Sequence, residues 1–216
     1  TIFSGTNDVC RESTATMTSV ADFSAQLRST LTRLSTGLPS AQLYVLSIPD
    51  WYGLWSAFGA DPLALSAWAA SGDCAALLGA SATDASRQAV RQRTLDLNAA
   101  IVTVCAEFPA CTHDGGAVHR LAFTATDLAY DYLHYSTAGQ ARVAAAAWAA
   151  GPYTVPAPLS SLTAQPTSST SISVSWARPA AAARTRILAR TGSYPSSPTD
   201  GTVVYDGTSA TGTQAL

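Results

Sequence analysis

The chain has 216 residues, of which 47% are apolar and only 12% are charged, and its formal net charge is −2. This composition excludes an intrinsically disordered protein, because disorder goes with few apolar residues and a high net charge. The small net charge also gives no basic patch for nucleic acid or for an anionic membrane surface, so we expect neither partner.

We do not expect the chain to span a membrane. The longest uncharged apolar run, 143–158, is interrupted by Gly151 and Pro152 and is shorter than the ~20 residues that a spanning helix needs. Strand-like sequence starts at Thr1 without a charged leader or a cleavage site, which favours an N-terminus produced by a cut.

The first elements in chain order predict an α/β fold. Residues 1–4 should end a buried strand that enters the turn at 5–8. Apolar residues then recur at helical spacing over 17–34, and Gly37 ends this helix. The apolar run 42–48 suits a buried parallel strand, and strand, helix, strand is the order typical of an α/β sheet.

Aromatic residues follow that second strand in the segment 49–55. Open α/β sheets place their ligand sites at the carboxyl ends of their strands, so Trp51, Tyr52 and Trp55 are candidates to line a substrate cleft. The alternative is a loop that packs against the core.

A longer, partly irregular insertion is expected to run from there to Ala82, followed by a helix over 84–107 and a last strand over 117–123. The apolar stripe of the second helix is predicted at Ala89, Leu95, Leu97, Ala100, Ile101 and Val104. A final Ala-rich helix should begin at Ser136 or Thr137 as its N-cap.

The composition changes after Trp148. The segment 151–157 contains the glycine and prolines of a linker, and the sequence beyond it is rich in Ser and Thr. In the run 171–176, Ile172, Val174 and Trp176 alternate with polar residues, which predicts a half-buried strand. Further strands are expected at 187–190 and 202–205. We therefore predict an α/β domain over 1–150 and an all-β domain over 158–216.

The chain contains four cysteines, Cys10, Cys74, Cys105 and Cys111. Cys105 and Cys111 bracket a short loop that a disulfide could close, which leaves Cys10 and Cys74 as the economical second pair, although three pairings are formally open. A zinc site with His113 is the rival interpretation, but no Cys-x2-Cys spacing supports it. Disulfides would imply an exported protein.

The motif Asp131-Tyr132-Leu133-His134 suits one half of a hydrolytic site. On a tight loop, the Asp131 carboxylate can accept the Nδ1–H of His134, which leaves Nε2 free to act as a base. The alternative is a structural histidine that is hydrogen-bonded to a neighbouring aspartate.

Residues 1–150 resemble the SGNH (GDSL-type) superfamily of esterases and lipases, in particular a secreted branch that includes phospholipase-B-like enzymes. The segment SGTNDVC at 4–10 is similar to the Gly-x-Asn-Asp block of that family, and DYLH at 131–134, followed by STAGQ at 136–140, is similar to its Asp-x-x-His block. The resemblance implies a flavodoxin-like three-layer α/β/α domain that hydrolyses carboxylic esters through an acyl-enzyme.

The resemblance also implies roles for individual residues. His134 would be the general base, Asp131 would orient it, and Asn7 would donate a hydrogen bond to the oxyanion; the alternative for Asn7 is a structural turn cap. His113 and His119 lack an acidic partner at this spacing, so we expect them to be surface or core residues.

The sequence departs from the family at the nucleophile. Neither Gly-Asp-Ser nor Gly-x-Ser-x-Gly occurs in these residues, and Ser4 lies on the strand that enters the Asn7 turn, which is not the position of the family's nucleophile. We therefore expect a fragment without its nucleophilic serine and oxyanion glycine, inactive by itself.

Residues 158–216 resemble the start of a fibronectin type III module, with Pro158, Leu162, Trp176 and Pro179 as the matching positions. This segment is shorter than the about 100 residues of such a sandwich, so we expect a partial module. It would act as a spacer or bind a polysaccharide or a cell surface. A non-catalytic adhesion protein that keeps the hydrolase fold is the alternative function.

The substrate class stays open between lipid, sugar and other small-molecule esters. No acidic cluster indicates calcium, and no glycine-rich phosphate loop is present, so no metal or cofactor is expected.

Overall fold

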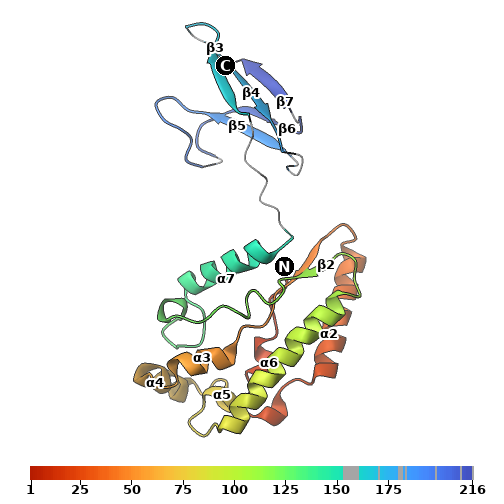
Figure 1. Cartoon of the computed structure of the whole chain (residues 1–216), viewed down its shortest axis with the longest axis vertical. Coiled ribbons are helices and arrows are strands. Elements are labelled where there is room, and N and C mark those ends of the chain that lie inside the picture. The colour runs from red at the N-terminus through yellow and green to blue at the C-terminus, as the bar shows by residue number, and fades with distance from the viewer. Residues whose placement is uncertain are drawn as a thin grey trace. The chain divides into compact units, whose positions relative to one another are not determined.

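The computed structural model describes residues 1–152, 161–169, 171–179, 182, 184–197, 199–209 and 211–215. The chain divides into two compact units, Thr1–Tyr153 and Thr154–Leu216 (Figure 1). The first unit is a mixed helix-and-strand domain, and the second unit is built from strands.

A small parallel sheet lies at the centre of the first unit. Strand β1 (Leu43–Val45) pairs in parallel with β2 (Cys111–His113), and Ile2 forms a parallel bridge to Val45. On this second edge of β1, the Ile2 N–H donates to the Tyr44 carbonyl at 2.7 Å, and the Leu46 N–H donates to the Ile2 carbonyl at 2.9 Å. The first segment, β1 and β2 therefore lie side by side and run parallel, as the strands of an α/β sheet do.

The prediction of a last strand at 117–123 is wrong. The third parallel segment comes earlier, at β2, and residues 115–120 form turns. The buried Asp114 carboxylate explains this, because it accepts the N–H groups of Gly116 at 3.0 Å and Val118 at 2.9 Å and so curls the backbone. Gly115 and Gly116 both have positive φ, which an extended strand excludes.

Helices cover both faces of this sheet. Leu43 and Val45 point into the main core, which is formed with helices α2 (Val20–Gly37) and α6 (Asp84–Cys105). Tyr44 and Leu46 point to the other face, where they pack against helix α7 (Thr137–Ala150). The Tyr44 hydroxyl donates to the Ala147 carbonyl of α7 at 2.7 Å, so one short strand joins the two helical layers.

The sequence-based helices are confirmed with small shifts at their ends. The Ser19 hydroxyl caps α2 by accepting the Asp22 N–H, and Ser136 caps α7 by accepting the Gly139 N–H. Leu95 is 41% exposed and was wrongly placed on the buried stripe of α6. The buried stripe instead follows 3.6-residue spacing through Val90, Thr94, Leu97, Ala100, Ile101 and Val104.

The partly irregular insertion predicted after β1 contains three helices joined by short irregular stretches. Helices α3 (Trp51–Phe58), α4 (Pro62–Ser71) and α5 (Ala75–Leu78) occupy the predicted insertion. The Asp50 carboxylate caps α3 by accepting the Gly53 N–H at 3.0 Å, and Asp61 caps α4, where Pro62 takes the first helical position. The predicted loop at 49–55 is therefore the start of a helix.

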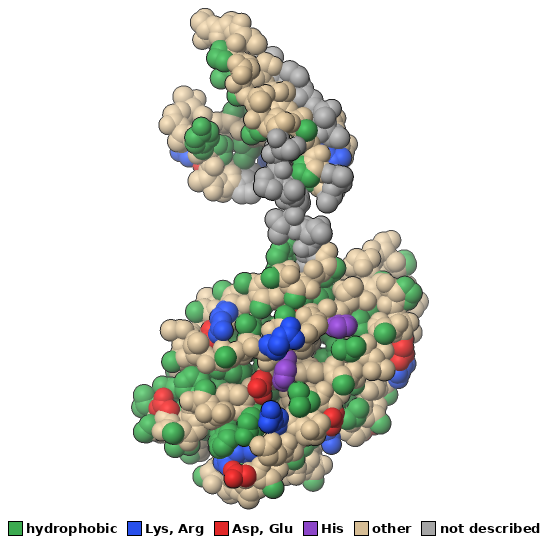
Figure 2. Space-filling model, viewed as in Figure 1, with side chains coloured by type: hydrophobic (Ala, Val, Ile, Leu, Met, Phe, Trp, Pro, Cys, Tyr) green, Lys and Arg blue, Asp and Glu red, His purple; other side chains and the backbone are tan. Residues whose placement is uncertain are grey.

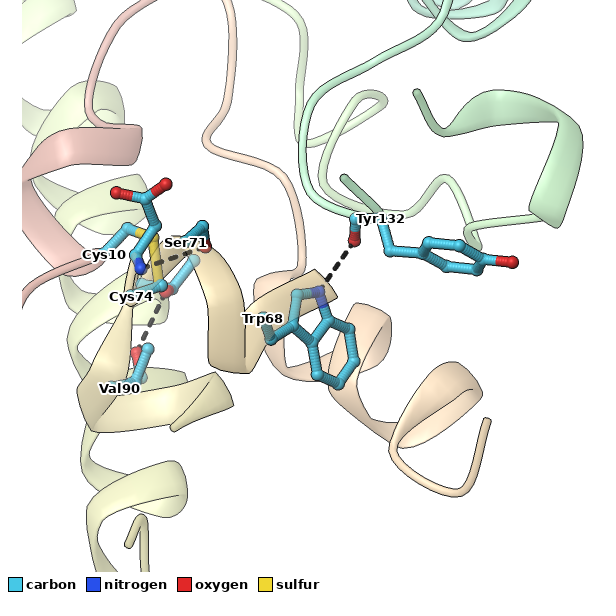
Figure 3. The surroundings of a disulfide bond; sticks show 8 residues. Cys10, Trp68, Ser71, Cys74, Val90 and Tyr132 are labelled. Carbon is cyan, nitrogen blue, oxygen red and sulfur yellow. Dashed lines mark hydrogen bonds between the residues drawn. A yellow bond between two sulfur atoms is a disulfide. The ribbon is translucent and has the colours of Figure 1, made fainter. Parts of the chain in front are cut away.

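Two disulfides close loops in the first unit, Cys10–Cys74 and Cys105–Cys111. The surroundings of the first bond are drawn in Figure 3. Because the sulfurs of Cys105 and Cys111 are bonded to each other, neither is a free thiolate that could bind zinc beside His113.

The second unit contains antiparallel strands. Strands β3 (Thr163–Pro166), β4 (Ile172–Ala177) and β7 (Thr211–Ala215) form one sheet in the order β3-β4-β7, and β5 (Thr185–Ala189) pairs with β6 (Thr202–Gly207). Val174 and Trp176 are buried as the alternation predicts, whereas Ile172 at the start of β4 is exposed. The Trp176 ring lies 4.6 Å from that of Tyr205. From residue 153 on, the predicted linker lies outside the described residues.

The visible face of the first unit carries no large field of one charge. Figure 2 shows acidic and basic side chains scattered among apolar and polar ones. Within the described ranges, no helix has the length and apolar character needed to cross a bilayer.

Candidate active site

The Asp131–His134 motif forms a compact hydrogen-bonded turn. One oxygen of Asp131, Oδ1, accepts the backbone N–H groups of Leu133 at 3.0 Å and His134 at 2.9 Å. The other oxygen, Oδ2, lies 2.7 Å from Nδ1 of the His134 ring. Because an ionised carboxylate can only accept, Nδ1 must carry the proton of this bond. Neutral His134 then keeps its Nε2 lone pair for a substrate or a nucleophile.

The charge state of Asp131 fits this role. Partial burial by itself raises the pKa of Asp131, but the hydrogen bonds from the His134 ring and from the backbone of Leu133 and His134 outweigh it. The net pKa is lowered from its ordinary value, so Asp131 is anionic at neutral pH. The His134 side chain is 72% exposed, so its base faces solvent.

The hairpin that carries this turn is tied to the start of α7. Leu128 and Tyr135 form an antiparallel bridge, and the Ala129 N–H donates to the His134 carbonyl at 2.8 Å. The Ser136 N–H donates to the Asp127 carbonyl, also at 2.8 Å. These backbone hydrogen bonds hold the Asp131–His134 turn in place against the start of α7.

The buried carboxylate of Asp127 also holds this hairpin against α7. The Asp127 carboxylate accepts the N–H and hydroxyl of Thr124 and forms an ion pair with Arg142 of α7. Gly139 lets α7 approach closely, because a Cβ at this position would lie 2.1 Å from the Asp127 carbonyl oxygen. The lack of room for a Cβ explains why the sequence has glycine in the first turn of α7.

Asn7 is presented by the short helix α1 (Thr6–Val9). Gly5 precedes it with φ of 112°, and a Cβ there would lie 2.5 Å from Ile48 Cδ1, so only glycine fits. Ile48 is fixed in turn by Asn98 of α6, whose amide accepts the Ile48 N–H at 2.7 Å and donates to the Ile48 carbonyl at 3.0 Å. The core thus sets the position of the Asn7 turn.

The Asn7 side chain is exposed and does not cap its own helix. In the part of the chain that the structure describes, its amide makes no hydrogen bond. The turn-cap alternative therefore has no support, and the amide is available to a ligand.

Asn7 and His134 line the same pocket, which has a volume of about 130 Å³. Its walls are formed by Thr6, Asn7, Cys10, Trp51, Asp73, Cys74, Leu133 and His134. Trp51 is the aromatic residue of this set and is 4% exposed. Of the described residues that line the pocket, none is a serine. Ser4 lines a neighbouring hollow of about 260 Å³ that also includes Asn7.

The other two aromatic candidates lie elsewhere. The Tyr52 hydroxyl accepts a hydrogen bond from Gln88 at 3.1 Å, and the Arg91 guanidinium lies 5.2 Å from the centre of its ring. The Arg87 guanidinium lies 4.5 Å from the centre of the Trp55 ring. Tyr52 and Trp55 thus pack against α6 and are absent from the residues that line the His134 pocket.

Ser47, Asp114 and His119 also lie together, at the carboxyl ends of β1 and β2, but they do not form a triad. The Ser47 hydroxyl donates to Asp114 at 2.7 Å and accepts the backbone N–H of His119 at 2.9 Å. The His119 ring bonds the Ile48 carbonyl at 3.0 Å through Nδ1. Each of these side chains hydrogen-bonds to the backbone, so this cluster stabilises the turns after β2. His113 also serves a turn, since its Nδ1 accepts the Gly115 N–H.

Sequence reasoning missed Asp73, Cys74 and Leu133 as pocket residues. Asp73 and Cys74 follow α4 in a segment that carries no motif, and they reach the site through the Cys10–Cys74 disulfide. The preferred pairing of Cys10 with Cys74 was the one sequence signal that could have placed them beside Asn7, and the structure contains this bond.

Comparison with protein-family models, with curated proteins and with solved structures gives no match. The chemistry of the site must therefore be argued from its geometry. That geometry places a histidine ring held by a carboxylate and an amide without a hydrogen-bond partner among the described residues on one pocket. These are groups that can act as a base and as a hydrogen-bond donor.

Proposed function

We propose that this chain belongs to an exported carboxylic-ester hydrolase of the SGNH type. In this proposal His134 is the general base, Asp131 orients it, and Asn7 donates a hydrogen bond to the oxyanion. The observation that carries the proposal is the 2.7 Å bond between Asp131 and Nδ1 of His134, in a turn that lines one pocket with Asn7.

The proposed chemistry follows from these groups. A serine hydroxyl attacks the acyl carbon while its proton passes to Nε2 of His134, and Asp131 stabilises the imidazolium that results. The Asn7 amide hydrogen-bonds the carbonyl oxygen as it becomes negative, which is worth ~2.7–4 kcal/mol for comparable donors. His134 then protonates the leaving alkoxide, and a water molecule, deprotonated by His134, releases the acid and restores the serine.

The nucleophilic serine is proposed to come from outside these 216 residues. The lining of the His134 pocket supports this, because it includes no serine from the described part of the chain. The edge of the parallel sheet beside Ile2 gives further support. Among the described residues, the one strand pairing of the segment 2–4 is the parallel bridge of Ile2 to Val45 of β1.

Hollows flank that edge on both faces. Thr1 and Phe3 line one of about 340 Å³ with residues of α7, and Ile2 and Ser4 line one of about 200 Å³ with residues of α2. A further parallel strand with helices on both sides would fill these spaces, as in the proposed flavodoxin-like three-layer domain. The nucleophile would lie at the carboxyl end of such a strand.

Two disulfides support export, because such bonds persist in oxidising compartments. The strands of the second unit and its buried Trp176 are compatible with a fibronectin type III-like module. We propose that this module is a spacer or attaches the enzyme to a polysaccharide or a cell surface.

The decisive experiment measures hydrolysis of p-nitrophenyl esters by the protein expressed from its intact gene. His134→Ala should lower kcat/KM by about 10⁴- to 10⁶-fold, and Asn7→Ala by about 10²- to 10³-fold. His113→Ala is the matched control, because this ring holds a turn outside the pocket, and it should leave activity unchanged. An ester hydrolase that is indifferent to His134→Ala would refute the assignment.

The position of the nucleophile has a separate test. The 216-residue chain is treated with a fluorophosphonate, which labels activated serines, and its intact mass is then measured. We expect no adduct. A stoichiometric adduct that disappears in His134→Ala would place the nucleophile within these residues, whereas an intact gene product that neither reacts nor hydrolyses esters would favour the adhesion protein.

A further inference from the structure

The turn that holds His134 contains a residue in an unfavourable backbone conformation. Tyr132, between Asp131 and His134, has a φ of 56°, in the left-handed region that residues with a Cβ rarely adopt. This conformation lets one carboxylate accept both backbone N–H groups and the ring N–H. It persists only if contacts around Tyr132 hold it.

One of those contacts comes from a distant helix. The indole N–H of Trp68, in the middle of α4, donates to the Tyr132 carbonyl oxygen at 3.1 Å, as Figure 3 shows. Trp68 is 1% exposed, so its ring is fixed by the main core and the N–H has little freedom to point elsewhere. Phe58 of α3 contacts the Tyr132 ring edge-on at 6.1 Å between centroids.

The same segment reaches the other half of the site. At the last residue of α4, the Ser71 hydroxyl accepts the Asp73 N–H at 3.2 Å, and Cys74 then forms the disulfide to Cys10 at the end of α1. Figure 3 shows this bond and the Trp68 contact in one view. Residues 68–74 therefore connect the Asn7 helix to the His134 turn.

We propose that Trp68 is a positioning residue for His134, because its indole N–H fixes the Tyr132 carbonyl and thereby the turn in which Asp131 holds the ring. The importance of this for catalysis rests on the proposed function, but the contact and its effect on the ring do not. Without the donor, the Tyr132 carbonyl loses its partner and the turn relaxes. The Asp131–Nδ1 bond then weakens, and the Nε2–H tautomer of His134 gains population.

Nitrogen NMR of the His134 ring in the 216-residue chain tests this without any ester turnover. The unsubstituted chain should show the neutral ring mainly as the Nδ1–H tautomer. In Trp68→Phe the ratio of the Nδ1–H to the Nε2–H form should fall about fivefold, the factor expected for the loss of about one net hydrogen bond. Trp55→Phe is the matched control, since Trp55 packs on α6 outside the pocket, and it should keep the original ratio.

A second variant separates the hydrogen bond from packing. Site-specific replacement of Trp68 by its benzothiophene analogue keeps the shape of the ring but puts sulfur in place of the N–H. The same fall in the tautomer ratio is expected, even if Trp68→Phe proves too unstable to measure. A folded analogue that keeps the original tautomer ratio would overturn the proposal. Loss of esterase activity in His134→Ala would be unaffected by that result, so the two proposals fail separately.

Discussion

Removing the Cys10–Cys74 disulfide should destabilise the first unit much more than removing Cys105–Cys111. The first bond joins residues 64 apart in the sequence, and the second joins residues 6 apart. A cross-link stabilises mainly by lowering the entropy of the unfolded chain, and this gain grows with the logarithm of the loop length. The expected losses of unfolding free energy are about 4 kcal/mol for Cys10→Ala with Cys74→Ala, and about 2 kcal/mol for Cys105→Ala with Cys111→Ala.

Urea unfolding followed by tryptophan fluorescence measures this difference, since every tryptophan except Trp176 lies in the first unit. The two double variants serve as controls for each other, because each removes two sulfurs and one bond. Equal losses, or a larger loss for the short loop, would refute the entropic reasoning. The stabilisation would then come from native contacts of the cystines.

Gly139→Ala should lower the unfolding free energy by about 1–3 kcal/mol, because the new Cβ would clash with the Asp127 carbonyl. Gly37→Ala is the control and should leave the unfolding free energy unchanged, since a Cβ there meets nothing within 4 Å. Equal melting curves for the two variants would contradict the close approach of α7 to Asp127. The pKa of Asp127 is lowered: burial raises it, but the hydrogen bonds from Thr124 and the charge of Arg142 outweigh burial. The pKa of Asp131 is also lowered: burial raises it, but the hydrogen bonds from the His134 ring and from the backbone outweigh burial. Both carboxylates therefore contribute stability above the ordinary carboxyl pKa, and this is lost as pH falls through the lowered native values. Urea midpoints between about pH 5 and pH 2 should fall less steeply in Asp127→Asn than in the unsubstituted chain, and parallel slopes would exclude Asp127 as a source.

The long amphipathic helices were predictable because local information determines them. Spaced apolar residues and a Ser or Thr cap specify α2, α6 and α7 within a few residues. Helix α3 was missed because Pro49 and Gly53 indicate a turn, whereas the Asp50 cap and burial of Trp51 and Leu54 decide for helix. Strand β2 was missed because it has only three residues and follows a disulfide-closed loop.

In the candidate site, too, the local contact was predictable from the sequence and the long-range contacts were not. The Asp131–His134 bond spans three residues, so the motif alone predicts it. The position of Asn7 against Ile48, the donation from Trp68 to Tyr132 and the presence of Asp73 in the pocket all depend on residues distant in sequence. No local pattern encodes these contacts, because they arise only when the core forms.

The short parallel sheet has a consequence for folding kinetics. Its contacts join distant parts of the chain; Ser47 after β1 and Asp114 after β2, for example, are 67 residues apart. Closing such loops costs entropy before any pairing energy returns, and high contact order slows folding. The helices are therefore expected to form first and the sheet last. In pulsed hydrogen exchange during refolding, the amide of Leu46 should gain protection later than those in the middle of α6.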